Sequence, residues 1–356
     1  MESNDAAINY CQTYSEVDSL GFACPEDLDK EAYVNFWNDY LPILARRERR
    51  WLKVGLPRAQ KLKRFVRKGV PAKLRATIWM LGCPQIELAK YEVSKTVIDA
   101  IRLDLPRTFP DNERLSSAAG KRIIGRILFR VAQHFPDIGY CQVGDPVASF
   151  IDRSVRRLEL RFRRERSRKH SLFSDQYVAF MLKGCANLQG FNFIAALLYL
   201  ILNDENATVR LMTHSILQRR NYYTADMSGI VIDIKVLRDL LRDRKVIPST
   251  LLRLIETDME MMLSKWLLCW FLETLPMESV LRIWDCLFVE GDAVLFRVAV
   301  TLIEASVPSL VKCRTLSEVL QVFRDIGTSH LALNCHHLLQ ASALSFSTKE
   351  IVFIVV

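Results

Sequence analysis

The amino-acid sequence predicts an all-α, multi-helical protein. Apolar residues recur three and four positions apart along most of its 356 residues, which is the period of an amphipathic helix. Strand-like runs are short and isolated, as at 230–234 and at the C-terminal end, 351–356. Half of the residues are hydrophobic, so the composition fits a large buried core and excludes a disordered chain.

The N-terminal part alternates between acidic, helical and basic stretches. Residues 1–30 are acidic and irregular, and residues 31–52 have the apolar spacing of an amphipathic helix. A basic run at 61–68 leads into Gly69-Val70-Pro71, a turn in which the proline suits the beginning of a helix. We expect that helix to extend to Gly82.

Helical patterns continue through the rest of the chain. One apolar stripe covers 97–105 and stops at Pro106, because proline has no amide hydrogen to donate. A second stripe covers 123–131. Further along, helical spacing recurs at 190–203, 207–218, 234–243, 248–258, 260–275, 277–289 and 293–305. No internal repeat is present, so a solenoid or propeller is excluded.

The charge of the chain is uneven. The net charge is +9, a value that by itself suggests nucleic acid or an anionic membrane as partner. Residues 143–189 carry ten Lys and Arg against five Asp and Glu, which is more than half of the excess. The arginine-rich stretch 153–169 has only Phe162 to stack on bases, so we expect no nucleic-acid partner and interpret it as a solvated segment.

The cysteines and the apolar runs indicate the compartment. Nine cysteines form no CxxC pair and no regular spacing, which is typical of reduced thiols in a cytoplasmic protein. Residues 1–10 are polar and acidic, unlike a signal peptide. The longest apolar run, 193–202, is shorter than a membrane span, and no cluster has zinc-ligand spacing. We expect neither a transmembrane segment nor a metal site.

Three short patterns combine charged or polar residues with apolar ones. Arg75 and Trp79 are four positions apart and share a helix face, which by itself predicts a buried tryptophan braced by an arginine. Tyr140-x-Gln142 has no meaning by itself.

The remaining pattern is Ile101-x-x-Asp104-x-x-Arg107. Spacing of three places Ile101 and Asp104 on one side of a helix, and Pro106 ends that helix so that Arg107 lies at its tip. Taken alone, this pattern more often marks a surface ion pair than a catalytic group.

Taken together and in their order along the chain, the three patterns are specific enough to indicate a protein family. Further short motifs match the same family. These are Gly69-Val70-Pro71, Thr108, Gly190-Phe191-Asn192-Phe193-Ile194-Ala195, Asn221-Tyr222-Tyr223 and Leu281-Arg282-Ile283-Trp284-Asp285-Cys286-Leu287-Phe288. Over residues 66–305 the chain resembles the TBC family of GTPase-activating proteins for Rab GTPases.

The resemblance implies an organisation and a partner. It implies a TBC domain over 66–310, preceded by an acidic segment and amphipathic helix over 1–65 and followed by a helical segment and tail over 311–356. The partner would be a Rab-family small GTPase in its GTP state, in vesicle trafficking. The protein would need no cofactor of its own, because GTP and Mg²⁺ belong to the GTPase. Membrane association would be peripheral, by recruitment to endomembranes through the Rab.

The resemblance also implies a mechanism in which two side chains are supplied in trans. Phosphoryl transfer to water needs charge stabilisation and a positioned water molecule. Arg107 would be the arginine finger, since a forked, always charged guanidinium suits the first task. Gln142 would be the glutamine finger, since its amide both donates and accepts hydrogen bonds. The supporting residues would be Ile101, Asp104, Tyr140, Arg75 and Trp79, with Asp104 orienting Arg107 or its loop.

One departure from the family pattern is a basic 47-residue insert, 143–189, between Gln142 and Gly190. The family runs from the glutamine into Gly-x-Asn-Phe without interruption. Val143 is encoded by GTN and Gln189 can be encoded by CAG, so an in-frame retained intron or gene-model error fits both ends of the insert. A genuine loop insertion is the alternative, since long loops cost little entropy.

The insert leaves two candidates for the glutamine finger. Gln189 directly precedes Gly190 and would replace Gln142 at the start of the next helix. Asn187 would then stand where the family has tyrosine, and it lacks the packing surface of that ring. The alternative to an active GTPase activator is therefore a catalytically impaired TBC module that binds a Rab GTPase without activating it.

Overall fold

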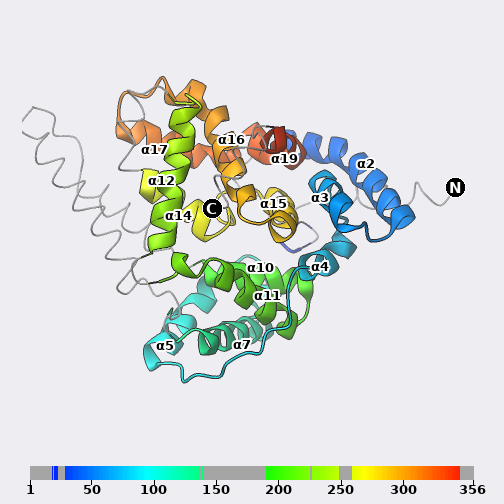
Figure 1. The fold of residues 1–356 in the computed structure, drawn as a ribbon, viewed down its shortest axis with the longest axis vertical. Coiled ribbons are helices and arrows are strands. Elements are labelled where there is room, and N and C mark those ends of the chain that lie inside the picture. Colours follow the sequence, from blue (N-terminus) through cyan, green and yellow to red (C-terminus); the bar gives the residue numbers. More distant parts are fainter. Residues whose placement is uncertain are drawn as a thin grey trace, which may run out of the picture.

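The computed structural model describes residues 18, 20–22, 29–136, 138, 190–224, 227–247 and 259–344. All regular elements in these ranges are helices, and no strand occurs in them (Figure 1). The predicted all-α class is confirmed for this part of the chain. Tyr140, Gln142, Gln189 and the insert lie outside the described residues.

The described residues form a succession of helices. In chain order they are α2 Lys30–Val54, α3 Ala59–Lys68, α4 Ala72–Met80, α5 Lys95–Asp104, η1 Leu105–Arg107, α6 Glu113–Ser116, α7 Ala118–His134, α10 Phe191–Leu202, α11 Glu205–Gln218, η2 Arg220–Tyr222, α12 Ser228–Asp243, α14 Met259–Leu268, α15 Met277–Glu290, α16 Ala293–Leu310, α17 Leu316–Asp325, η3 Ile326–Thr328, α18 His330–Leu333 and α19 Cys335–Leu344. The three η elements are short 3-10 helices.

Two groups of helices are visible in Figure 1. Helices α5, α7, α10 and α11 lie together in the lower half of the view, and α12, α14, α15, α16, α17 and α19 lie in the upper half. Helices α2 and α3 lie on the right of the upper group, and α4 lies below them. One hydrophobic cluster runs through both groups, and it includes Ile124 and Leu197 as well as Trp284 and Val300. The two groups therefore share one core.

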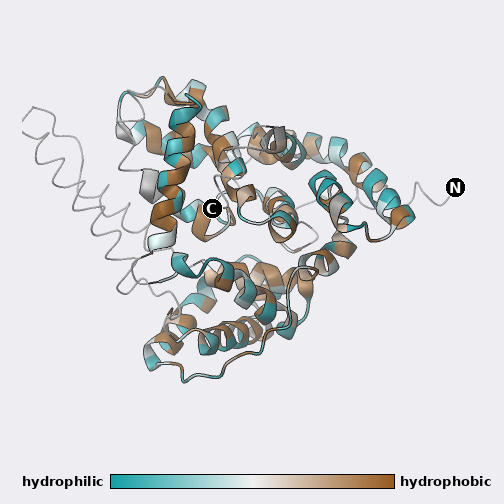
Figure 2. Cartoon of the chain, in the orientation of Figure 1, coloured by the Kyte–Doolittle hydropathy of each residue, from teal (hydrophilic) through white to brown (hydrophobic). Residues whose placement is uncertain are grey.

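The amphipathic patterns that predicted the helices are visible on the ribbon. Figure 2 shows hydrophobic and hydrophilic stretches alternating along α7 and α12. Helix α15 differs, because its residues from Ser279 to Leu287 are all buried. It packs against α3, α4, α16 and α19. A helix that is buried on all sides and still carries charged residues needs partners for those charges.

Gly190, the residue before α10, packs very closely against Cys269. Gly190 precedes the helix, and a Cβ atom added to it would lie 2.5 Å from the Sγ atom of buried Cys269. Any larger residue there would have to displace the loop after α14. The predicted start of this helix at Gly190 is confirmed to within one residue.

Some predicted elements were wrong in extent or type. The strand-like run 230–234 lies inside α12, because a short apolar run does not separate a strand from a buried helix. The helix predicted over 260–275 ends at Leu268, since Trp270 and Phe271 adopt positive φ angles of 49° and 66°. The basic run 61–68 belongs to helix α3, which the sequence analysis did not predict.

One described helix, α16, is long and apolar enough to cross a membrane. However, 67% of its apolar window is buried inside the protein. Its burial against α12, α15, α17 and α19 accounts for its apolar composition.

Candidate functional site

Arg107 lies at the end of a short 3-10 turn. Helix α5 is capped by the Ser94 side chain, which accepts a hydrogen bond from the Val97 amide at 3.4 Å. The α-helix ends at Asp104, and Pro106 occupies the following 3-10 turn. Arg107 is exposed. The predicted end of the helix before Pro106 is confirmed.

The loop after Arg107 is held by a buried chain of hydrogen bonds. The hydroxyl of Thr108 donates to the backbone carbonyl of Asp104 at 2.8 Å. The Nδ2 amide of Asn192, in the first turn of α10, donates to the Thr108 hydroxyl at 2.8 Å. Asp104, Thr108 and Asn192 are each at most 3% exposed. Because these groups are shielded from water, the two hydrogen bonds fix the backbone on both sides of Arg107.

Aromatic packing supports the same loop, which we call the arginine loop (residues 105–112). Phe109 has a positive φ of 45°, an uncommon conformation for a bulky residue. Its ring packs edge-on against Phe22 at a centroid distance of 4.8 Å and against Phe193 of α10 at 5.0 Å. The arginine loop is therefore clamped between the N-terminal segment and α10.

The N-terminal segment is attached to the arginine loop by hydrogen bonds as well. Asn112 caps α6 through the Leu115 amide, and its Nδ2 donates to the carbonyl of Leu20 at 2.9 Å. The carboxylate of Asp18 accepts from the amides of Leu20 and Phe22 at 2.8 and 2.9 Å. Residues far from Arg107 in sequence thus help to hold its loop.

Arg75 and Trp79 belong to a different, largely buried network between α4 and α15. The Arg75 guanidinium lies 2.9 Å from Glu278 and 3.3 Å from Asp285. Asp285 also accepts a hydrogen bond from the indole nitrogen of Trp79 at 2.9 Å. Burial raises the pKa of Asp285, while the charges of Arg75 and Arg282 oppose that shift. The arrangement is that of a structural ion network, in which each buried charge has an opposite partner.

The tryptophan itself packs into an aromatic cluster. Trp79 contacts Trp284 at a centroid distance of 5.8 Å and Phe288 at 5.1 Å. The indole nitrogen of Trp284 donates to the carbonyl of Trp270 at 3.1 Å. These contacts join α4 and α15 to the turn that follows α14.

The comparisons with known proteins identify the family. The Rab-GTPase-TBC domain family matches residues 73–181 and 184–311. The chain belongs to this family. Growth hormone-regulated TBC protein 6 of Caenorhabditis elegans is 36% identical over 347 residues, which cover 95% of this chain and 91% of that protein. Growth hormone-regulated TBC protein 1 of Homo sapiens is 31% identical over 344 residues, which cover 91% of this chain and 88% of that protein.

Two solved structures share the TBC fold. The Chlamydomonas flagellar RabGAP TBC domain has a TM-score of 0.61 at 22% identity, covering 93% of this chain and 99% of its own. The Ypt/Rab-GAP domain of Gyp1p has a TM-score of 0.59 at 14% identity, covering 87% of this chain and 99% of its own. The predicted multi-helical TBC fold is confirmed.

The TBC domain structure brings together some of the predicted site residues and separates others. Ile101, Asp104 and Arg107 lie on α5 and the turn that follows it, with Ile101 and Asp104 buried. Arg75 and Trp79 are also buried, but in the network between α4 and α15. The sequence analysis expected a buried tryptophan beside an arginine, and both side chains are buried. Among the described residues no group of His, Cys, Asp and Glu has the arrangement of a metal site.

The sequence analysis assigned no role to Thr108 or Asn192. Both were visible as parts of motifs, and one signal was present for Asn192. It is a polar residue in an otherwise apolar helix turn, and a buried amide requires a hydrogen-bond partner. The partner was not predictable, since 84 residues separate it from Asn192 in the chain.

Proposed function

We propose that this TBC protein is a GTPase-activating protein that stimulates GTP hydrolysis by a Rab-family small GTPase. The observation that carries the proposal is the combination of an exposed arginine with a rigidly held loop. Arg107 is exposed while its neighbours Asp104 and Thr108 are buried and hydrogen-bonded. An arginine that enters another protein's active site must be both accessible and positioned.

In the proposed reaction, Arg107 acts on the bound nucleotide of the partner. Its guanidinium donates hydrogen bonds to phosphate oxygens and stabilises the negative charge that spreads over the transferred group. The TBC protein forms no covalent bond and needs no cofactor, because GTP and Mg²⁺ are held by the Rab. An arginine finger in the comparable Ras system contributes a factor of about 10³–10⁵ in rate.

The second group in this proposal is a glutamine that orients the attacking water. Gln142 is assigned to it by resemblance to the family, and Gln189 is the alternative created by the insert. Both residues lie outside the described part of the chain, so the assignment rests on sequence alone. We place the protein in the cytoplasm, with peripheral recruitment to endomembranes through the GTP-bound Rab.

A binding-only TBC module is the second candidate, favoured by the insert that follows Gln142. One experiment separates the two functions. A panel of GTP-loaded Rab proteins is mixed with the full chain, and single-turnover hydrolysis and binding are measured in parallel. Accelerated hydrolysis of at least one Rab supports the activator. Binding of a GTP-loaded Rab without acceleration supports the impaired module, and neither binding nor acceleration with any Rab contradicts both.

A further inference from the structure

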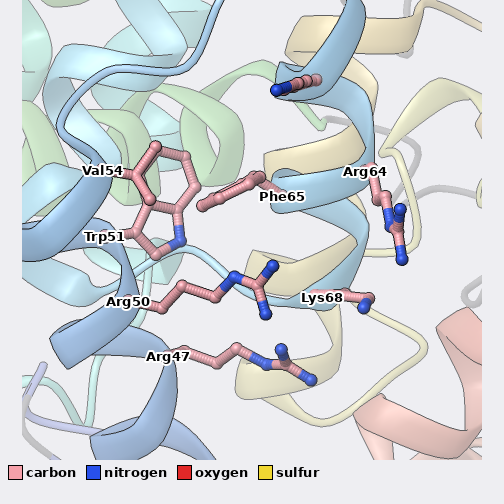
Figure 3. A pocket seen from close by; sticks show the side chains of 8 residues that line it. Arg47, Arg50, Trp51, Val54, Arg64, Phe65 and Lys68 are labelled. Atoms are coloured by element: carbon pink, nitrogen blue, oxygen red, sulfur yellow. The ribbon is translucent and has the colours of Figure 1, made fainter.

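A basic pocket lies between α2 and α3, on a part of the molecule that the proposed activity does not use. Its volume is about 280 Å³. The lining residues are Arg47, Arg50, Trp51, Val54, Lys61, Arg64, Phe65 and Lys68. We call this the α2–α3 pocket. Figure 3 shows the guanidinium groups of Arg47 and Arg50 pointing from α2 across to the side on which Arg64 and Lys68 lie.

The positive charge of the α2–α3 pocket is not neutralised by the described part of the chain. Five of the eight lining residues are cationic and none is acidic. No salt bridge joins any of these five to a described carboxylate, and Glu48 on α2 pairs with Lys73 outside the pocket. Burial lowers the pKa of Lys68, and the neighbouring charges of Arg64, Arg47 and Arg50 lower it further. Cations held this close to one another are stabilised by a polyanionic ligand.

The walls of the pocket are fixed by packing. The indole nitrogen of Trp51 donates to the carbonyl of Gly69 at 2.8 Å, and its ring packs edge-on against Phe65 at 5.3 Å. The Arg50 guanidinium lies over the Phe65 ring, 5.4 Å from its centroid. The Trp51 and Phe65 rings therefore hold the wall of the pocket in place before a ligand binds. This reduces the conformational entropy that is lost on binding.

A further cation lies behind the pocket. The Arg282 side chain is buried and donates to the carbonyls of Val66 and Arg67 in the last turn of α3 at 3.0 and 2.8 Å. It lies beside Gly69, and its charge lowers the pKa of Arg47 after the larger effects of burial and of Arg50. Arg282 also lies 3.4 Å from the carboxylate of Asp285, so the buried network partly offsets its charge at this place.

Exposed aliphatic side chains lie at and just beyond the C-terminal end of α2. Val54, which lines the pocket, is 50% exposed, and Leu52 and Leu56 are 75% and 57% exposed. Three exposed aliphatic residues within five positions at this end of α2 fit insertion between lipid head groups near a basic site. A soluble phosphate ligand would explain the cations and leave these residues unexplained.

We infer that the α2–α3 pocket binds the phosphate groups of a multiply phosphorylated membrane lipid, with Leu52, Val54 and Leu56 entering the interface. In Figure 1, α2 and α3 lie at the opposite end of the view from α5, which leads to Arg107. The protein can therefore contact a membrane through the pocket while the arginine loop faces a GTPase. This inference does not depend on the proposed GTPase activation.

The test is vesicle sedimentation with the full chain. Phosphatidylcholine vesicles contain either phosphatidylinositol bisphosphate or phosphatidylserine at matched total charge, and soluble inositol trisphosphate is titrated separately. We expect tighter binding to the bisphosphate vesicles than to the phosphatidylserine vesicles. Arg47→Gln with Arg50→Gln should weaken binding about thirtyfold, since each basic residue at an anionic leaflet contributes about a factor of five.

The matched control is Arg46→Gln with Arg49→Gln, which removes the same charge from exposed positions of α2 that do not line the pocket. It should weaken binding by less than about fivefold. Equal losses in the two pairs would overturn the inference, because they would indicate diffuse attraction. If the first pair lowers the melting temperature, Arg64→Gln with Lys68→Gln tests the other wall, with Lys63→Gln as its control.

A last pair separates membrane lipid from soluble phosphate. Leu52→Ser with Leu56→Ser should weaken vesicle binding severalfold and leave the affinity for inositol trisphosphate unchanged. Binding of inositol trisphosphate by the native chain without any vesicle binding would overturn the membrane assignment. An absence of preference for bisphosphate over phosphatidylserine vesicles would overturn the pocket assignment.

Discussion

At the scale of single residues, Thr108 and Asn192 hold the arginine loop against α10 through one hydrogen bond of 2.8 Å. Thr108→Val keeps the shape of the side chain and removes the hydroxyl. The Asn192 amide then remains buried without this acceptor, which costs about 1–3 kcal/mol of stability. We expect the stimulated rate of hydrolysis to fall as well, because the loop that carries Arg107 loses an anchor.

The matched control for this prediction is Thr108→Ser, which retains the hydroxyl. Denaturant unfolding gives the stability difference, and single-turnover hydrolysis with a responsive Rab gives the rate. A valine variant with native stability and native rate would show that the hydrogen bond has no part in positioning the loop.

Gly190 permits a prediction that tests the packing at the start of α10. Gly190→Ala places a Cβ 2.5 Å from the Sγ of Cys269, and such overpacking costs about 1–3 kcal/mol. Cys269→Ala removes the sulfur, so the double variant should be more stable than the sum of the single changes predicts. A double-mutant cycle by chemical denaturation measures the coupling. Additive effects would mean that the two residues do not contact each other in solution.

At the scale of elements, the buried ion network joins α4 to α15. Asp285→Ala leaves Arg75 and Arg282 without this carboxylate and removes the acceptor of the Trp79 indole. Breaking a buried pair in this way costs about 3–5 kcal/mol. The prediction is a large drop in melting temperature measured by circular dichroism. Arg102→Gln, which removes an exposed i,i+3 ion pair, serves as control and should change the stability little.

The helices that the sequence predicted well are those with a clear apolar stripe and a terminator. Helix α5 was predicted because Pro106 follows it, and α7 because its stripe is long. Helix α3 was not predicted, since half of its ten residues are basic and its apolar residues are few. The early end of α14 depends on the left-handed conformation of Trp270, which tertiary packing imposes and local sequence does not indicate.

At the scale of the whole molecule, the sequence predicted that Asp104 ends a helix and that Arg107 follows at its tip, and the roles of both residues stay predictions. The sequence did not indicate that α10 and the N-terminal segment hold the turn that carries Arg107. Those contacts join residues 84 and 92 positions apart, and no local pattern carries such information. The glutamine remains a prediction from family resemblance.

The insert gives a prediction for the whole chain. Deleting residues 143–189 joins Gln142 directly to Gly190, which the sequence analysis expects to restore the uninterrupted family motif. We expect a protein at least as stable and as active as the full chain, because α10 is anchored by its own contacts with Cys269 and Thr108. Melting temperature and single-turnover hydrolysis are compared for the two chains. Unfolding or loss of activity on deletion would show that the insert is an integral part of the domain.

The central claim is that Arg107 acts directly on the nucleotide of a bound Rab. The measurement that tests it most directly is single-turnover GTP hydrolysis by a responsive Rab with the native chain, Arg107→Lys and Arg107→Ala, at saturating concentration of each. Lysine retains the charge but not the planar fork, so both variants should lose nearly all of the stimulation, about 10³-fold or more, at unchanged melting temperature. Near-native stimulation by a folded Arg107→Lys or Arg107→Ala protein would contradict the account.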